Sequence, residues 1–194
     1  YTIIWDRMVK RSDGYHIDGH KEAITYEITY DLKDGSVTQE NPTSYKVTDS
    51  CTLNNPTRTG YTFAGWTGSN GDQPQTTVEV KKGIPGAKNF TANWEIKTYK
   101  VIFEYKDSAN ARKLDEQTIE YNFNATAPSV DSVIITPDTD KFFIFKGWDD
   151  TTTDKLENLK KEDIDKRLVT SEKKYVAQFG SQLSKIMFFV AKEV

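Results

Sequence analysis

Internal repetition constrains this chain more than any other feature, because a repeated order of blocks defines the unit from which the fold is built. Three short blocks of the 194-residue sequence recur in the same order, with their apolar residues placed alike in both copies. They are residues 26–34, 61–66 and 90–94 in the first copy, and residues 99–107, 143–148 and 175–179 in the second. The blocks lie further apart in the second copy, which indicates insertions in its loops. The sequence therefore predicts two homologous modules, at residues 25–96 and 97–179.

The blocks have the pattern of β-strands. In residues 26–34 apolar and polar side chains alternate with a period of two, which puts the apolar ones on one face. Asp34-Gly35 and Asn70-Gly71 are turn signals, because Gly and Asn tolerate a positive φ. We therefore expect an α+β fold that is mostly β, with mixed sheets and short helices.

One segment of the second module has a helical pattern instead. Within residues 154–168, apolar side chains recur every three to five positions among charged ones. These apolar residues are Leu156, Leu159, Ile164 and Leu168. The spacing predicts an amphipathic helix of about three turns, capped by Thr153 or Asp154.

The two ends of the chain fit neither copy. Residues 1–24 hold one apolar stretch, Tyr1–Trp5, followed by turn signals, and residues 180–194 hold a predicted strand at Lys185–Val190. Either both ends belong to neighbouring modules or they pair with each other. Between the two modules only residues 95–98 separate the closing strand from the next opening one. A connection this short predicts a defined relative orientation of the modules.

Composition excludes several classes of function. Lys and Arg number 26 against 29 Asp and Glu, and no segment is strongly basic, so we expect no nucleic-acid partner. The longest apolar run, residues 186–191, is far short of the roughly 18 residues of a membrane span, so we expect no direct membrane insertion of this segment. Cys51 is the single cysteine, which rules out an internal disulfide. Aromatic residues make up 12% of the chain, which suits two small cores. The start at Tyr1, without Met or a signal peptide, is typical of a mature or excised segment.

A longer motif runs through the first module. It reads Pro56-Thr-Arg-x-Gly60-Tyr61-x-Phe63-x-Gly65-Trp66 and is closed by Thr91-Ala-Asn-Trp94. This string resembles the internalin-type B-repeat, also called the Listeria–Bacteroides repeat. The second module keeps Phe145-x-Gly147-Trp148 and a closing strand that ends at Phe179. It resembles a divergent copy of that repeat or the related mucin-binding-protein repeat.

The resemblance implies a fold and a setting. It implies small β-grasp-like modules strung along secreted, wall-attached or outer-surface bacterial proteins, where they act as stalks and adhesion modules. The residues that carry the structural signature are Gly60, Tyr61, Phe63, Gly65, Trp66, Trp94, Phe145, Gly147, Trp148 and Phe179. Gly65 and Gly147 lack a Cβ, so another backbone or a ring can approach them closely. We predict that Trp66 and Trp148 fill the two cores, and the alternative is that they are exposed platforms for sugars.

Residues with catalytic or metal-binding chemistry are few. His16 and His20 are four positions apart, as metal ligands on a helix would be, but nearby glycines favour a surface loop. Cys51 is expected on a strand or at the start of a short helix, and pairing with a histidine as a nucleophile is the least favoured option. The acidic pairs Asp149-Asp150 and Asp138-x-Asp140 lack the spacing of a calcium loop and are expected to serve in turns and caps. We expect no catalytic residue, no metal and no cofactor.

These observations favour a non-catalytic, extracellular repeat module of a bacterial cell-surface or secreted protein. Its expected role is that of a stalk or adhesion module in contact with a host or matrix glycoprotein or carbohydrate. The alternative is a carbohydrate- or glycoprotein-binding module, which a concave patch of three or more exposed rings would favour. Candidate partner contacts are the loop aromatics Tyr15, Tyr45 and Tyr121.

Overall fold

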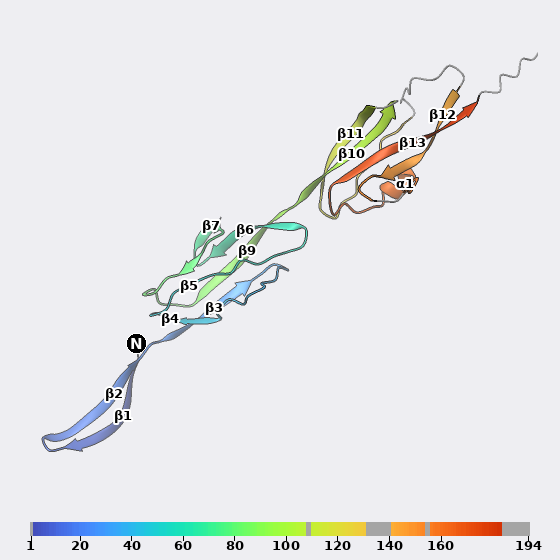
Figure 1. Cartoon of the computed structure of the whole chain (residues 1–194). Helices are drawn as coiled ribbons and strands as arrows, with labels where there is room; N and C mark the ends of the chain where they lie inside the picture. Colours follow the sequence, from blue (N-terminus) through green and yellow to red (C-terminus); the bar gives the residue numbers. More distant parts are fainter. Residues whose placement is uncertain (1, 108–109, 131–140, 154–155, 184–194) are drawn as a thin grey trace, which may run out of the picture. The chain divides into compact units, whose positions relative to one another are not determined.

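The computed structural model describes residues 2–107, 110–130, 141–153 and 156–183 (Figure 1). The chain divides into two compact units, Tyr1–Glu95 and Ile96–Val194. Strands dominate the described residues, with parallel and antiparallel pairs and one short helix. The predicted class, mostly β with mixed sheets, is therefore confirmed, whereas the β-grasp-like character stays a prediction.

The N-terminal segment is a β-hairpin. Strands β1 (Thr2–Arg11) and β2 (Gly14–Glu22) pair antiparallel and form a two-stranded sheet of their own. Gly14 closes the turn with a φ of 137°, which favours glycine. The register shifts between Trp5 and Arg7, so Asp6 is the extra residue of a β-bulge. In the part of the chain that the structure describes, this segment thus pairs with itself.

Module 1 follows the hairpin and contains a five-stranded sheet in the order β4-β3-β9-β6-β7. Its strands are β3 (Thr25–Asp31), β4 (Ser44–Lys46), β6 (Tyr61–Gly68), β7 (Gly71–Gln75) and β9 (Lys88–Ile96). The opening strand β3 pairs in parallel with the closing strand β9, with Tyr30 opposite Phe90. A second, two-stranded sheet joins β5 (Cys51–Thr52) to β8 (Glu79–Val80).

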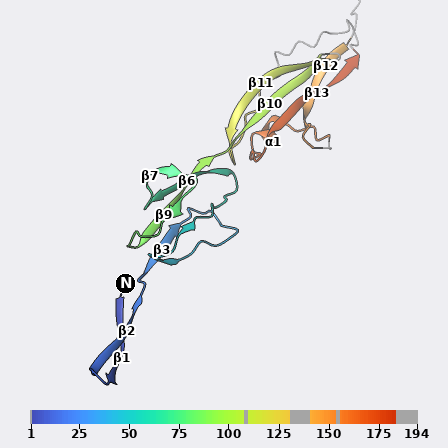
Figure 2. The same cartoon turned by 60° about the vertical axis from the view of Figure 1, so that its left-hand side comes forward.

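Module 2 repeats this arrangement with four strands in the order β11-β10-β13-β12, which both views show (Figures 1 and 2). They are β10 (Thr98–Asp107), β11 (Asn110–Glu120), β12 (Lys141–Asp150) and β13 (Lys173–Leu183). The opening strand β10 again pairs in parallel with the closing strand β13, with Phe103 opposite Tyr175. Strand β13 includes residues 180–183, and the strand predicted at Lys185–Val190 lies outside the described residues. Only Lys97 lies between β9 and β10, and the relative orientation of the modules stays a prediction.

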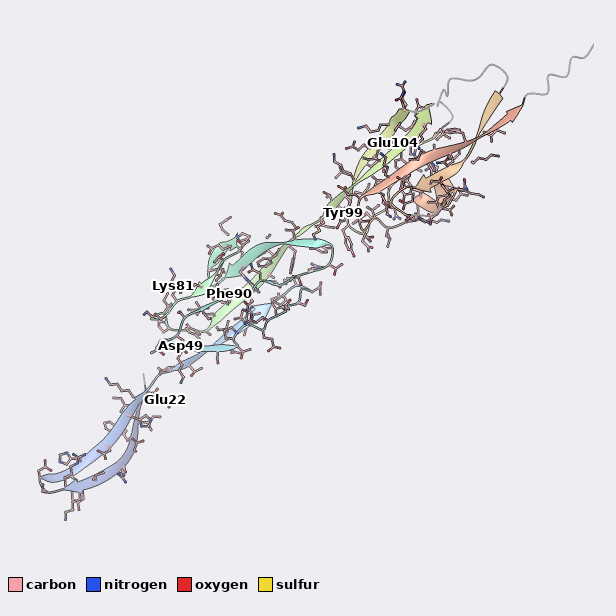
Figure 3. The ribbon with its side chains drawn as sticks, in the orientation of Figure 1. Glu22, Asp49, Lys81, Phe90, Tyr99 and Glu104 are labelled. Atoms are coloured by element: carbon pink, nitrogen blue, oxygen red, sulfur yellow. The ribbon has the colours of Figure 1, made fainter. Side chains whose placement is uncertain are left out.

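Each module has a hydrophobic core of its own. In module 1 the core includes Ile28 on β3 and Phe90 on β9. Figure 3 labels Phe90. In module 2 it includes Val101 and Phe103 on β10. The alternation predicted for the opening block holds in β3, where Ile28 is buried while Glu27 and Thr29 are exposed.

The prediction of a helix of about three turns over residues 154–168 is wrong. Helix α1 spans only Lys161–Ile164, with Lys160 as its N-cap, so capping by Thr153 or Asp154 is wrong as well. The physical reason is a competing backbone pairing: Leu159 exchanges two hydrogen bonds of 2.8 Å with Trp148 of β12, one residue after a positive φ at Asn158. Of the four apolar residues, Leu159 and Ile164 are buried, whereas Leu156 and Leu168 are exposed. No helix of the described residues is long and apolar enough to cross a membrane.

Candidate functional site

Three rings of the module 1 signature, Phe63, Trp66 and Trp94, form a cluster of five aromatic rings. The other two rings are Tyr30 of β3 and Phe90 of β9. Phe63 contacts both tryptophans edge-on, with ring centroids 5.5 Å from Trp66 and 5.4 Å from Trp94. Tyr30 stacks on Phe90 at 6.0 Å and meets Trp66 at 5.9 Å. Edge-to-face and stacked pairs at these distances add to the burial of each ring.

Module 2 has the same cluster, built from Phe103, Phe145, Trp148, Tyr175 and Phe179. Phe145 contacts Trp148 at 5.6 Å and Phe179 at 5.8 Å, both edge-on. Phe103 stacks on Tyr175 at 5.3 Å and meets Trp148 at 5.2 Å. Each ring comes from the same position of the repeated blocks as its counterpart in module 1, so the sequence repeat is also a repeat of the core.

The two signature tryptophans are core residues, as predicted. Trp66 is 0% exposed and Trp148 is 1% exposed, so neither presents a platform to a sugar. The indole nitrogen of Trp66 donates to Asn55 Oδ1 at 3.1 Å, and that of Trp94 donates to the Leu32 carbonyl at 3.1 Å. Partners of this kind are what buried indoles require.

The glycines before these tryptophans permit a close backbone contact, as predicted. Gly65 has a φ of +135°, and a Cβ there would lie 2.5 Å from the backbone nitrogen of Gln75. Gly147 has a φ of +146°, and a Cβ there would lie 2.6 Å from the backbone of Asn158. Both the conformation and the space therefore require glycine.

The Pro-Thr-Arg string of module 1 forms a turn before β6. Gly60 has a φ of +79°, and the Tyr61 amide donates to the Arg58 carbonyl at 3.1 Å. The guanidinium of Arg58 lies over the Tyr61 ring, 4.0 Å from its centroid, and forms an ion pair of 3.3 Å with Asp34. The string thus stabilises this turn through a cation–π contact.

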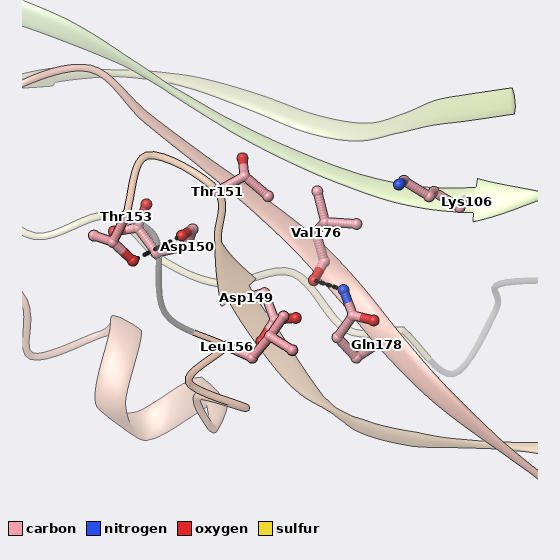
Figure 4. Close-up of a pocket in the computed structure, with 8 residues that line it drawn as sticks. All are labelled: Lys106, Asp149, Asp150, Thr151, Thr153, Leu156, Val176 and Gln178. Atoms are coloured by element: carbon pink, nitrogen blue, oxygen red, sulfur yellow. Dashed lines mark hydrogen bonds between the residues drawn. The ribbon is translucent and has the colours of Figure 1, made fainter.

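A pocket of about 300 Å³ lies beside β12 and β13 in module 2 (Figure 4). Its lining residues are Lys106, Asp149, Asp150, Thr151, Thr153, Leu156, Val176 and Gln178. The two carboxylates are the only acidic groups of this lining, and both are buried, at 3% and 1% exposure. Figure 4 also shows Thr153 donating to the backbone carbonyl of Asp150, at 3.0 Å.

Internal hydrogen bonds use both of these carboxylates. Asp149 accepts from the amides of Glu157 and Asn158 at 3.1 Å each. Asp150 accepts from the amide and hydroxyl of Thr152 and forms an ion pair of 2.9 Å with Lys173. Burial alone would raise the pKa of Asp150, but these donors outweigh it and lower the pKa below the usual value.

The acidic pair therefore holds a loop, as predicted: Asp149 Oδ1 and both carboxylate oxygens of Asp150 accept internal hydrogen bonds. Asp138 and Asp140, the other acidic pair, lie outside the described residues. Within the described ranges, no group of three or more His, Cys, Asp or Glu side chains is placed to hold a metal ion.

The histidines lie on a strand, so the predicted surface loop is wrong. The glycines that favoured a loop have other roles, because Gly14 closes the hairpin and Gly19 leaves space for the ring of Trp5 in mid-strand. His20 pairs with Asp6 at 3.0 Å, and this hydrogen bond raises the pKa of His20.

Cys51 lies on strand β5, one of the two placements expected for it. Burial is the main cause that raises the pKa of its thiol, which disfavours the thiolate that a nucleophile needs. Burial likewise raises the pKa of Tyr30, to about 12.

The three candidate partner contacts differ in exposure. The prediction that Tyr45 is a loop aromatic is wrong, because Tyr45 lies on β4 and is only 4% exposed. Its hydroxyl donates hydrogen bonds to the carbonyls of Ile84 and Gly86. Tyr15 is 68% exposed but belongs to strand β2. Tyr121 is half-buried after β11. Contacts of Tyr15 and Tyr121 with a partner stay predictions.

The sequence analysis did not predict that apolar side chains of residues 1–24 form an exposed surface. Ile3, Trp5, Met8 and Ile17 are each more than half exposed. The signal that could have found them is the alternation of apolar residues at Tyr15 and Ile17 with His16 and Asp18, which predicts a strand.

Comparison with known families identifies the repeat of module 1. Residues 26–92 match the family model of the Listeria-Bacteroides repeat domain. The match confirms the resemblance for module 1 and covers the whole five-ring cluster except Trp94. For module 2 the resemblance to this repeat domain stays a prediction.

The chain was also compared with curated proteins and with solved structures. No curated protein matches the chain. Among solved structures, the chain is similar to streptococcal high identity repeats in tandem (SHIRT) domains 3-4 from a cell surface protein. The two share 16% sequence identity with a TM-score of 0.26, over 82% of this chain and 99% of that one.

Proposed function

We propose that this chain is a non-catalytic repeat segment of a bacterial surface protein, where it acts as a stalk and adhesion module toward host or matrix macromolecules. The observation that carries the proposal is the duplicated ring cluster, because two modules with one core design and a one-residue connection suit a repetitive spacer. The Listeria–Bacteroides repeat in module 1 supports the surface setting, since the resemblance implies secreted or wall-attached proteins.

The polar chemistry of the modules supports a role without turnover. The buried carboxylates Asp149 and Asp150 are engaged in the fold, and the thiol of Cys51 has a raised pKa. Repetition also favours adhesion by several weak contacts, because linked sites gain effective concentration.

The carbohydrate-binding alternative has less support. Among the described residues, three aromatic rings are more than half exposed: Trp5, Tyr15 and Phe123. Of these, Trp5 and Tyr15 both lie on the β1–β2 hairpin, and Phe123 lies in module 2. Three exposed rings in one concave patch would have favoured the carbohydrate-binding function.

Two measurements test the proposal together. Surfaces coated with matrix glycoproteins and with purified glycans are exposed to the chain, and we expect retention on the glycoprotein with little on the free glycans. A screen with glycosidase, esterase and peptidase substrates is expected to show no turnover. Turnover that disappears in His16→Ala, His20→Ala or Cys51→Ala would overturn the non-catalytic role.

A further inference from the structure

The pocket of module 2 lies on the face of the sheet that is turned away from the ring cluster. In the register of β12 and β13, Asp149 lies opposite Val176. The neighbouring row holds Trp148 opposite Ala177, and both of these residues belong to the core. Successive residues of a strand point to opposite faces of a sheet. Asp149 and Val176 therefore share the outer face, yet they are only 3% and 5% exposed.

The carboxylates of this region differ in whether a cation accompanies them. Asp150 lies 2.9 Å from the ammonium of Lys173. Glu104, which is on the same face as Asp149 because it too lies opposite Val176, forms an ion pair of 2.9 Å with Lys174. Asp149 instead uses its Oδ1 to accept from two backbone amides at 3.1 Å, and these carry no charge.

The second oxygen of Asp149 opens into the pocket. Within the part of the chain that the structure describes, Oδ2 has no hydrogen-bond or ion-pair partner. The fully buried side-chain atoms that lack a hydrogen bond in those residues do not include it, so Oδ2 keeps access to solvent. Because Asp149 lines the pocket, that access runs through the pocket. A buried carboxylate is costly unless a cation and hydrogen bonds compensate it, so the pocket favours a cationic ligand.

The rest of the lining suits an alkyl chain that ends in a planar cation. Val176 and Leu156 supply aliphatic surface, and Leu156 is 83% exposed although it lines the pocket (Figure 4). Thr151 Oγ1 and Gln178 Oε1 can each accept a hydrogen bond, since both side chains donate elsewhere, to backbone carbonyls. Arginine combines an apolar stem with a flat fork of donors, and it is less strongly hydrated than lysine. The pocket volume of about 300 Å³ has room for one such side chain.

Other ligands match the lining less well. None of the lining residues is aromatic, so a sugar has no ring to stack on. A calcium ion takes about six to eight oxygen ligands, and within the described ranges no three His, Cys, Asp or Glu side chains gather to hold a metal. An anionic ligand would find Lys106, but this lysine is exposed, whereas the buried charges of the lining are negative.

We propose that this pocket binds an arginine side chain of a partner protein. The guanidinium donates to Asp149 Oδ2, and further donors of its fork reach Thr151 and Gln178. The stem packs against Val176 and Leu156. Charge-assisted hydrogen bonds from a guanidinium to a carboxylate are among the stronger polar contacts in proteins. The inference rests on the proposed adhesive role for the source of the arginine, which is an exposed residue of a host or matrix protein.

The probe is N-acetyl-L-arginine amide, titrated into the full chain and followed by NMR. We expect saturable shifts of the signals of Asp149, Leu156 and Gln178, with a dissociation constant on the order of 1 mM for so small a ligand. The matched neutral analogue, N-acetyl-L-citrulline amide, has nearly the same shape without the charge and is expected to bind about tenfold more weakly or less. Equal binding of the two analogues would overturn the proposal. So would tighter binding of N-acetyl-L-lysine amide, glucuronate or calcium chloride.

Variants of the chain test which side chains form the site. Asp149→Asn keeps an oxygen for the two backbone amides but removes the charge, and it is expected to weaken binding about tenfold. Lys106→Met is expected to strengthen binding slightly, by about twofold at most, because a like charge is removed. Weaker binding in Lys106→Met would show an anionic ligand site and overturn the proposal.

A second substitution keeps the test decisive if Asp149→Asn disturbs the loop. Leu156→Ser changes an exposed side chain and is expected to weaken binding about threefold, because the stem loses apolar contact. Leu168→Ser is the matched control, since Leu168 is also exposed, at 52%, but does not line the pocket. It is expected to leave the affinity unchanged, and equal losses in the two serine variants would exclude this pocket as the site.

Retention on surfaces coated with matrix glycoprotein separates this inference from the proposed function. We expect the parent chain to be retained more strongly than Asp149→Asn, and N-acetyl-L-arginine amide to compete. If the two chains are retained equally and the arginine analogue does not bind, the pocket assignment fails while the adhesive role stands. If the analogue binds but neither chain is retained, the adhesive role fails while the pocket assignment stands.

Discussion

Modules 1 and 2 bury the same ring cluster but close it with different segments. In module 1 the chain turns at Asn70-Gly71, and β7 returns along β6 until the backbone of Gln75 lies against Gly65. In module 2 a longer loop returns, and the backbone of Asn158 lies against Gly147. In both modules a backbone segment packs against the glycine that precedes the core tryptophan, although the two modules supply that segment from different structures.

The returning segments are held by different interactions. The tight turn of module 1 uses backbone pairing and the amide of Asn70, which donates to the Trp66 carbonyl at 2.7 Å. The loop of module 2 is held by Asp149 and Asp150, which take up its amides and the ammonium of Lys173. Where module 1 uses a local turn, module 2 thus uses the buried carboxylates Asp149 and Asp150. The stability of module 2 therefore depends on whether these carboxylates are protonated.

The largest expected effect tests what the modules share. Trp66→Ala and Trp148→Ala are each expected to destabilise their own module by about 3–5 kcal/mol, because a fully buried ring is lost. Urea unfolding followed by NMR signals of each module measures the loss. Phe123→Ala is the control, since Phe123 is 59% exposed and is expected to change stability by about 0.5 kcal/mol at most. In variants that keep Trp66 or Trp148 as the single tryptophan, acrylamide quenching at the rate of free tryptophan would contradict the burial of that ring.

The next effect tests the glycine contact. Gly65→Ala and Gly147→Ala are expected to cost about 2–3 kcal/mol each, because alanine disfavours the positive φ and its Cβ meets backbone. Gly71→Ala is the matched control, because Gly71 has a φ of +108° but open space around it. It is expected to cost about 1 kcal/mol. Equal losses at Gly65 and Gly71, by the same unfolding measurement, would show that the close approach adds nothing.

The sequence predicted the shared parts well because they are local and repeated. The Gly-Trp pair, the closing strands and the alternation in β3 depend on near neighbours, and all were found as expected. The helix over residues 154–168 failed because Leu159 pairs with Trp148, a contact between segments that spacing does not encode. Tyr45 failed for a related reason, since its burial depends on carbonyls at Ile84 and Gly86 far along the chain. The uncovered hairpin face was missed because exposure becomes visible only once the cores are known.

The third prediction concerns the buried pair of module 2. The lowered pKa of Asp150 means that its carboxylate stabilises the fold above the unfolded value of about 4, and that this contribution is lost as pH falls through the folded pKa. Asp150→Asn is expected to cost about 1–3 kcal/mol at neutral pH, because Lys173 loses its partner. Urea midpoints of module 2 at neutral pH and below about pH 4 are compared. The variant should show a weaker acid dependence than the parent, and an unchanged acid dependence would exclude this role of the pair.

The smallest effect sharpens the contrast between buried and exposed charge within module 2. Hydrogen bonds from Lys113 and Lys100, at 2.8 Å and 3.0 Å, lower the pKa of Glu116 to about 2, yet this carboxylate lies on the surface of β11. Salt screens exposed pairs strongly, with a Debye length of about 3 Å at 1 M. We therefore expect NMR titration to show the pKa of Glu116 rising toward about 4 at high salt while that of Asp150 stays lowered. Glu116→Gln should leave the urea midpoint of module 2 nearly unchanged. If instead the pKa of Glu116 ignores salt, or its substitution destabilises module 2 as much as Asp150→Asn, the exposed cluster contributes to the fold in the way the buried pair does.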